Sequence, residues 1–261
     1  MHPKLESEVE MTTNILITGT KAGIGNGLLS AYAARPNTII IAAVRDAPES
    51  QAVKAMIQRV RDLAEDSCVI PVQYDAAEDT SAQHLIAYIH KKHPQIQHLD
   101  LVIANAGIST HWESCTEVTA ERLKHHYAVN TIGPILLYQA TRDLLLSSSN
   151  PKFFVISSVV GSVQVGPGVG FQIPAYGTSK AAINWFTRKA NIEEEKIVVA
   201  AVSPGWVQTK MGHQAAVHLK QDKPPMTLEQ SVAGLLKIFD GMGKEESKGV
   251  FLDAAGEPLA W

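Results

Sequence analysis

Short apolar runs alternate with longer amphipathic stretches along most of this chain, and this alternation limits its fold more than any other feature. Short apolar runs are typical of buried strands, and amphipathic segments between them are typical of the helices that join parallel strands. The sequence therefore predicts an α/β fold: a doubly wound, mainly parallel, seven-stranded sheet with helices on both faces. The predicted strands are 14–18, 38–43, 68–73, 99–104, 152–157, 196–202 and 249–252, and the predicted helices are 24–34, 49–64, 81–92, 117–146, 175–194 and 228–240.

Length and composition predict one folded domain. The chain has 261 residues, of which 45% are hydrophobic and 19% charged, so it can bury a full core. Residues 1–11 contain alternating charges and no apolar run, and we expect them to form a flexible N-terminal tail rather than a secretory signal. Residues 12–261 are expected to form the single domain.

Charge and special residues exclude several classes of function. A net charge of −3 argues against a nucleic-acid partner. No apolar window reaches the roughly 18 residues of a membrane helix. Cys68 and Cys115 are too few for a disulfide scaffold, which favours the cytoplasm. The histidine pairs have no carboxylate or cysteine to complete a metal site, so none is expected.

The polar residues of interest follow the ends of the predicted strands. In a doubly wound sheet, ligands bind in the crevice at the carboxyl ends of the strands, where the strand order reverses. We therefore expect the functional site there. The residues that follow the first six strands in this way are Gly19, Arg45, Asp75, Asn105, Ser158 and Pro204.

A glycine-rich segment joins the first strand to the first helix. Residues 18–25 read Thr-Gly-Thr-Lys-Ala-Gly-Ile-Gly, which lets backbone amides approach a pyrophosphate at a helix N-terminus. The spacing departs from the strict G-x-G-x-x-G pattern, because Leu28 stands where its third glycine would fall. The alternative interpretation is a glycine-rich turn without a ligand.

Charged residues after the second strand favour a phosphorylated dinucleotide. Arg45 stands where an acidic residue would accept hydrogen bonds from the ribose of NAD, and a guanidinium there can pair with a 2′-phosphate. Lys21 adds a second cation, unless it is only a solvated loop residue. Asp46 is expected to cap the next helix. The predicted cofactor is NADP(H).

Tyr176 and Lys180 form the strongest chemical signal. Their i, i+4 spacing places both side chains on one face of a helix. A lysine ammonium beside a phenol lowers the tyrosine pKa toward a value useful for proton transfer. Ser158 supplies a hydroxyl for a substrate carbonyl. A lone Tyr-x-x-x-Lys pair is more often surface decoration.

From about residue 14 to residue 261 the chain resembles the short-chain dehydrogenase/reductase family, which has a Rossmann-type fold. The resemblance rests on several motifs in a fixed order. They are the 18–25 loop, Asn105-Ala106-Gly107, Asn130, Ser157-Ser158, Tyr176 with Lys180, and Pro204-Gly205. The ending from Phe251 to Trp261 is similar to that of the fungal norsolorinic acid ketoreductases and their carbonyl-reductase relatives.

The resemblance implies a role for each matching residue. Tyr176 is the expected proton donor, Lys180 tunes it and holds the nicotinamide ribose, Ser158 orients the carbonyl, and Asn130 bends the long helix and holds a water beside Lys180. The implied cofactor-binding set is Gly19, Lys21, Gly23, Ile24, Gly25, Arg45, Asp75, Asn105, Ala106, Gly107, Tyr176, Lys180, Pro204, Gly205, Val207 and Thr209. The implied substrate-pocket set is Ser109, Phe171, Trp206 and Met211.

Two departures from the family pattern stand out. Ser158 and Tyr176 are 18 positions apart, and the glycine-rich insert between them predicts a flexible loop over the site. Ala22 replaces an arginine that the family often has before the middle glycine, which leaves Lys21 and Arg45 to supply positive charge.

Together these features predict an NADPH-dependent ketoreductase for an aromatic or polyketide-like carbonyl, with a small molecule as substrate and a homodimer or homotetramer as the assembly that the family implies. Two alternatives remain open. One is an NAD-dependent alcohol dehydrogenase of the same fold. The other is a non-catalytic NADP(H)-binding sensor or scaffold.

Overall fold

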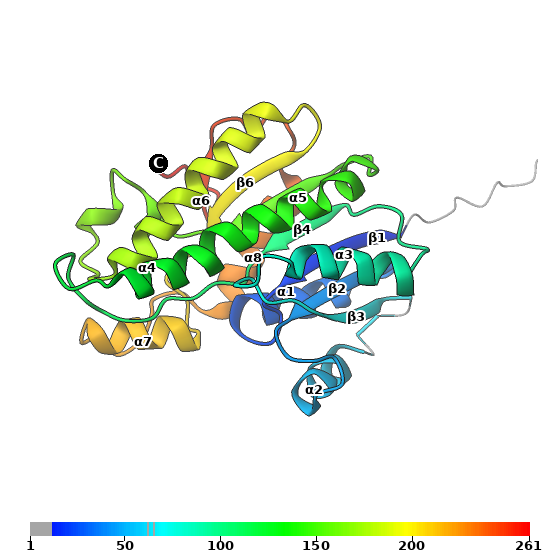
Figure 1. Cartoon of the computed structure of the whole chain (residues 1–261), viewed down its shortest axis with the longest axis horizontal. Helices are drawn as coiled ribbons and strands as arrows, with labels where there is room; N and C mark the ends of the chain where they lie inside the picture. The colour runs from blue at the N-terminus through cyan, green and yellow to red at the C-terminus, as the bar shows by residue number, and fades with distance from the viewer. Residues whose placement is uncertain (1–11, 62, 65) are drawn as a thin grey trace, which may run out of the picture.

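A computed structural model describes residues 12–61, 63–64 and 66–261, and the predicted N-terminal tail lies outside them. Seven strands form one sheet in the order β3-β2-β1-β4-β5-β6-β7 (Figure 1), and every neighbouring pair is parallel. The predicted fold class is confirmed. The strands are β1 (Thr13–Thr18), β2 (Thr38–Val44), β3 (Cys68–Gln73), β4 (Leu101–Ala104), β5 (Lys152–Ile156), β6 (Val198–Ser203) and β7 (Phe251–Asp253).

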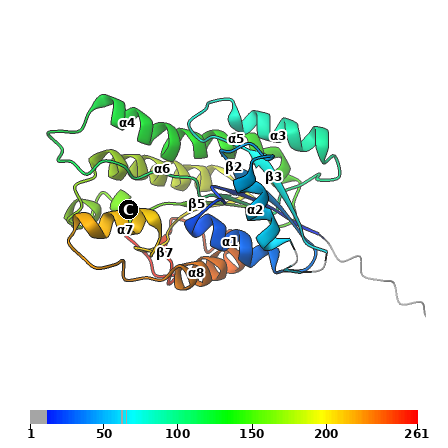
Figure 2. The same ribbon diagram turned by 90° about the horizontal axis from the view of Figure 1, so that it is seen from below.

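Helices cover both faces of the sheet, because successive strand side chains point to opposite faces. In β1, Leu16 joins the core cluster under α3, α5 and α6, whereas Ile15 and Ile17 join the cluster under α1, α2 and α8. Figure 2 shows these two helical layers on either side of the strands. The helices are α1 (Gly23–Ala33), α2 (Gln51–Val60), α3 (Ser81–Lys92), α5 (Gly133–Leu146), α6 (Pro174–Glu193) and α8 (Leu228–Gly241).

The predicted helix at 117–146 begins at Ala120 and is not regular throughout. It is divided into α4 (Ala120–Tyr127), a π-helical turn η1 (Ala128–Ile132) and α5. The first residue of α5 packs closely, because a Cβ on Gly133 would lie 2.4 Å from the backbone oxygen of Ala76. Pro134 also lacks the N–H that a regular helix would use.

The second helix is shorter than predicted, and its cap is a different residue. α2 begins at Gln51, and the Ser50 hydroxyl accepts a hydrogen bond from the Val53 backbone N–H. Asp46 is therefore not the cap. Its carboxylate instead forms an ion pair with Lys21, across the gap between the β2 exit and the glycine loop.

One helix, α7 (Lys210–His218), is absent from the sequence prediction. Thr209 caps it by accepting a hydrogen bond from the Gly212 backbone N–H. Strand ends also shift by one to two residues. β4 begins at Leu101 instead of Leu99, whose N–H donates to the Leu144 carbonyl oxygen of α5.

Among the described residues, no helix is both long enough and apolar enough to cross a membrane. The strand order reverses between β1 and β4, the two central strands, whose following helices pack on opposite faces. A crevice at the carboxyl ends of these strands is the expected ligand site of a doubly wound sheet.

Candidate active site

The glycine loop lies in the crevice between β1 and β4. Gly19 and Gly23 have φ values of +72° and +57°, which glycine adopts without strain. Gly25 is held more tightly, since a Cβ there would lie 2.4 Å from both the Asn105 Nδ2 and the Gly19 oxygen. The loop is thus a close backbone cradle around the start of α1.

Asn105 and Ala106 complete this cradle from the β4 side. The Thr18 hydroxyl accepts hydrogen bonds from both of their backbone N–H groups, at 3.0 and 2.9 Å. The Asn105 side chain donates to the Thr18 carbonyl oxygen at 2.8 Å. These bonds hold the ends of β1 and β4 together, as their sequence positions predict.

The first turn of α1 is open to an anion. Ala22 occupies the N-cap and has no side-chain acceptor for the N–H groups of that turn, and the turn carries no acidic residue. A helix N-terminus of this kind favours a phosphate. Ile24, by contrast, packs its side chain partly against the core, so it can offer only its backbone to a ligand.

Charged residues gather at the exits of β1 and β2. Arg45 is exposed, and its carbonyl oxygen accepts a hydrogen bond from the Gln73 side chain at the end of β3. Lys21 and Asp46 form an ion pair in which both side chains are partly exposed. This pair was missed from the sequence, because nothing local links two residues that are 25 positions apart.

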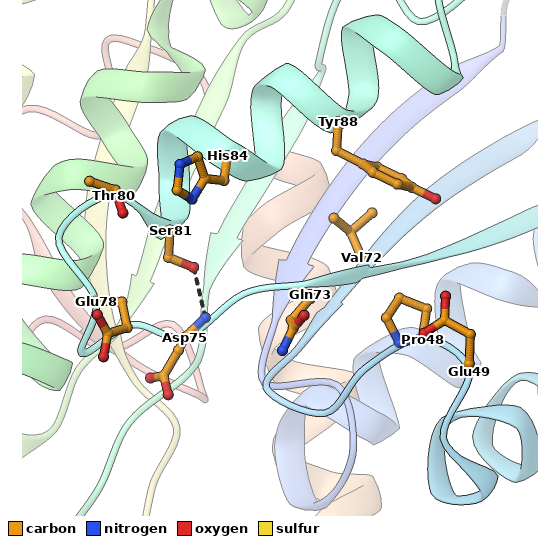
Figure 3. Close-up of a pocket in the computed structure, with 10 residues that line it drawn as sticks. All are labelled: Pro48, Glu49, Val72, Gln73, Asp75, Glu78, Thr80, Ser81, His84 and Tyr88. Atoms are coloured by element: carbon orange, nitrogen blue, oxygen red, sulfur yellow. Dashed lines mark hydrogen bonds between the residues drawn. The ribbon is translucent and has the colours of Figure 1, made fainter.

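Asp75 lies at the exit of β3, beside a cavity of about 520 Å³ (Figure 3). Its backbone N–H donates to the Ser81 hydroxyl at 2.9 Å, and its carboxylate accepts from the Ala77 N–H at 3.0 Å. Glu49 and Glu78 line the same cavity. The cavity therefore has an acidic rim at the exit of β3.

Tyr176 and Lys180 lie one turn apart on α6, with the Lys180 Nζ 5.8 Å from the centre of the Tyr176 ring. The Lys180 ammonium donates to the Ile156 carbonyl oxygen at 2.7 Å. Burial lowers the pKa of Lys180 to about 8. Burial also raises the pKa of Tyr176 to about 12, although a hydrogen bond with Ser158 acts in the opposite direction.

The sequence predicted that Lys180 lowers the pKa of Tyr176, but among the protein's own residues burial raises that pKa instead. Desolvation penalises the phenolate, and it also penalises the ammonium that would stabilise it. At neutral pH the tyrosine remains protonated. A buried, protonated phenol is a suitable proton donor for an alkoxide that develops beside it.

Asn130 lies in the π turn η1 and links α6 to the β4 exit. Its side chain accepts from the Ile108 N–H at 2.8 Å and donates to the Ile108 carbonyl and the Ser179 hydroxyl. A Cβ on Gly107 would lie 3.3 Å from Asn130 Oδ1 and 3.7 Å from Lys180 Nζ. The three predicted residues Asn130, Gly107 and Lys180 therefore meet.

The exit of β6 closes the crevice from the other side. A Cβ on Gly23 would lie 3.4 Å from the Thr209 side chain, so the glycine loop faces the start of α7. The Pro204 carbonyl oxygen accepts from the Ser231 hydroxyl, and Val207 is buried. Gly205 has a φ of +83°. The predicted residues from β1, β4 and β6 thus surround one crevice.

The predicted substrate-pocket residues occupy different environments. Phe171 and Trp206 are half-buried with ring centroids 5.6 Å apart, Ser109 is buried, and Met211 is exposed on α7. Sequence reasoning missed Trp112, whose ring contacts both Phe171 and His218. The tryptophan lies eight residues beyond β4, where no motif marks it.

The glycines of the insert before α6 differ in role. Gly161 and Gly166 pack tightly, since Cβ atoms there would lie 2.7 Å from Lys180 and 2.2 Å from Val160. Gly168 and Gly170 have open space around them. Part of the insert is thus packed on α6, where the sequence predicted a flexible loop.

Comparison with known proteins identifies the class. Residues 13–219 match the short chain dehydrogenase family, so the chain belongs to that family of oxidoreductases. It is 34% identical over 254 residues to a norsolorinic acid ketoreductase of Dothistroma septosporum, covering 95% of this chain and 92% of the relative. The norsolorinic acid ketoreductase of Aspergillus parasiticus is 32% identical, with coverages of 95% and 91%.

A solved structure has the same fold. The NADPH-bound carbonyl reductase from chicken fatty liver superposes with a TM-score of 0.82 and 28% identity, covering 96% of this chain and all of that one. The resemblance to short-chain dehydrogenases, and to norsolorinic acid ketoreductases within them, is confirmed.

Proposed function

We propose that this protein is an NADPH-dependent ketoreductase that reduces a ketone to a secondary alcohol. One observation carries the proposal. Tyr176, Lys180 and Ser158 meet in the same crevice as the glycine loop, with Tyr176 hydrogen-bonded to Ser158 and Lys180 buried behind it. This arrangement combines a proton donor, a hydroxyl for the carbonyl and a dinucleotide cradle.

The residues around the crevice fit a phosphorylated dinucleotide. The tight packing of Gly25, the uncapped first turn of α1 and the exposed Arg45 match a pyrophosphate and a 2′-phosphate. The NADPH-bound state of the chicken carbonyl reductase supports this choice. When bound, NADPH would supply the hydride that attacks the carbonyl carbon.

The chain's own residues manage the oxygen of the carbonyl. The Ser158 hydroxyl donates to that oxygen and orients it, and Tyr176 transfers the proton of its Oη to the oxygen as the alkoxide develops. Lys180, while charged, stabilises the tyrosinate that remains. Asn130 is a positioning residue, since its hydrogen bonds fix the start of α6 against the β4 exit.

The substrate in this proposal is an aromatic or polyketide-like ketone. The norsolorinic acid ketoreductases among its relatives support this class, and the half-buried, adjacent rings of Phe171 and Trp206 are consistent with it. A single domain, a homodimer or homotetramer, and a cytoplasmic location complete the proposal as the features that the family and composition predict.

Kinetics with NADPH and NADH on a panel of aryl ketones test the proposal. We expect turnover with NADPH, at least 100-fold less in Tyr176→Phe because one general acid contributes about 10²- to 10⁴-fold. Arg45→Ala should raise KM for NADPH about tenfold and leave KM for NADH unchanged. A preference of the unaltered enzyme for NADH would favour an NAD-dependent alcohol dehydrogenase. Tight NADPH binding with no turnover would favour a sensor.

A further inference from the structure

Four aromatic side chains, three from separate loops and one from the end of α7, form one cluster beside the proposed active site. Trp112 follows β4, Phe171 precedes α6, Trp206 follows β6, and His218 ends α7. The Trp112 ring centroid is 5.9 Å from that of Phe171 and 4.6 Å from that of His218, with which it stacks, and Phe171 meets Trp206 edge-on at 5.6 Å. Figures 1 and 2 place α7 at the end of the molecule where α4 and α6 begin.

A backbone feature recurs in this cluster. His111, Gly170 and Gly205 have φ values of +64°, +75° and +83°, and each immediately precedes one of the three larger rings. Positive φ is uncommon for a residue with a Cβ, so His111 adopts it at a cost in conformational energy. Because a left-handed φ changes the direction of the chain, it also changes the direction in which the next side chain leaves the backbone.

Further bonds tie these loops to one another. The Glu113 N–H donates to the Gln172 carbonyl oxygen at 2.8 Å, which joins the Trp112 and Phe171 loops. Glu113 also pairs with Arg122 of α4. The Trp206 indole N–H donates to the Gly212 carbonyl oxygen at 3.0 Å, which anchors that ring to α7. The cluster is thus held in one arrangement by contacts outside the rings.

The three larger rings are half-buried, so part of each ring remains available to a ligand. Phe171 lies five residues before Tyr176 in the chain, and Trp206 follows Gly205 at the β6 exit, and from these two positions we infer that the cluster borders the crevice. Offset-stacked and edge-to-face contacts favour a flat aromatic partner, and an aliphatic ketone gains little from them.

We propose that Trp112, Phe171 and Trp206 form an aromatic wall that selects ketones with fused, planar rings, and that the left-handed residue before each ring sets its angle. The inference rests on the proposed ketoreductase function and names the residues that decide its substrate. His218, stacked on Trp112, positions α7 against the wall.

The sharpest test compares two glycines. Gly170 and Gly249 have φ values of +75° and +70°, and a Cβ at either would meet nothing within 4 Å, so alanine imposes the same kind of backbone strain at both. Only Gly170 adjoins a ring of the wall. Gly249 lies before β7, at the opposite end of the strands.

We expect Gly170→Ala to raise KM for 2-acetylnaphthalene about tenfold and to change kcat less than twofold, because ring contacts of this kind are worth up to about a factor of ten. KM for cyclohexanone should stay the same, and Gly249→Ala should change neither value. Phe171→Leu should reproduce the selective rise in KM. Equal effects on both ketones, or no effect of Gly170→Ala, would overturn the wall.

Calorimetric binding of 2-acetylnaphthalene separates this inference from the proposed function. If the protein binds 2-acetylnaphthalene but reduces no ketone, and if Gly170→Ala and Phe171→Leu weaken this binding, the aromatic wall is supported and the ketoreductase function is refuted. The opposite result has two parts: Tyr176→Phe abolishes turnover, and Gly170→Ala has the same KM for 2-acetylnaphthalene as the unaltered enzyme. That result would support the ketoreductase function and refute the aromatic wall.

Discussion

The two sides of the crevice are built by different means. On the nucleotide side, glycine backbone packs directly against Asn105 and Ala106, and the hydrogen bonds join residues at the ends of adjacent strands. On the ketone side, large aromatic rings from loops meet one another, with open space around Gly170. Substitutions on the nucleotide side would therefore cause steric clashes, whereas substitutions of the rings on the ketone side can change which substrate is preferred.

The largest effect is expected where the nucleotide side is tightest. Gly25→Ala would force a Cβ to within 2.4 Å of the Gly19 oxygen and of the Asn105 side chain. We expect a loss of about 3 kcal/mol in the free energy of unfolding, at the upper end for overpacking of a dense site. Urea denaturation measures this loss, and NADPH affinity should fall with it.

Gly241→Ala is the matched control. A Cβ at Gly241, the last residue of α8, meets nothing within 4 Å, and alanine favours a helix more than glycine does by about 0.5–1 kcal/mol. This variant should be slightly more stable than the original protein. Equal stability of the Gly25→Ala and Gly241→Ala variants would refute the contrast between the two sides of the crevice.

The same contrast explains what the sequence predicts and what it does not. The glycine loop, the Asn105 turn and the Tyr176–Lys180 pair have fixed spacing within one strand exit or one helix turn, so local patterns identify them. Trp112 and the Lys21–Asp46 pair acquire their roles from residues far away in the chain. No local pattern records such contacts.

Element boundaries were missed for related reasons. The apolar periodicity runs from α4 into α5 and does not record the π turn between them, nor the close packing of Gly133 on the distant Ala76. α7 is short and contains Gly212, so its periodicity is weak, and Thr209 was interpreted only as a cofactor contact although it is also the helix cap. The parallel, doubly wound sheet follows from the β/α alternation along the chain and was predicted more easily.

The next largest effect concerns Lys180, which lies between the nucleotide side and the ketone side of the crevice. Because its pKa is lowered to about 8 while the pKa of Tyr176 is about 12, Lys180 loses its charge first as the pH rises. We expect kcat/KM for NADPH, which reports the free enzyme, to fall about tenfold per pH unit above pH 8. Lys180→Arg, whose charge persists, should remove this fall near pH 8.

The stability of the protein supplies an independent measurement of the same group. Between about pH 8 and the ordinary lysine value of 10.5, the unfolded chain binds one more proton at Lys180 than the folded protein, so this residue makes stability rise with pH. Lys180→Met should lack that rise relative to the unaltered protein. If kcat/KM does not change through pH 8, and if the stability of Lys180→Met depends on pH in the same way as that of the unaltered protein, Lys180 has the pKa of an ordinary lysine.

The smallest effect is expected at the exposed edge of the nucleotide side. Asp46 pairs with Lys21, and it places a negative charge beside the exit where Arg45 would meet the 2′-phosphate. Asp46→Asn removes this charge and releases Lys21 toward the phosphate. Since both side chains are partly exposed, solvent screens the pair, and we expect KM for NADPH to fall only about two- to threefold.

KM for NADH, which lacks that phosphate, should stay the same, and Asp46→Glu should preserve the original value for NADPH. A rise in KM for NADPH in Asp46→Asn would mean instead that the ion pair holds Lys21 in its binding position, so that even this exposed edge depends on a fixed arrangement like that of the glycine cradle.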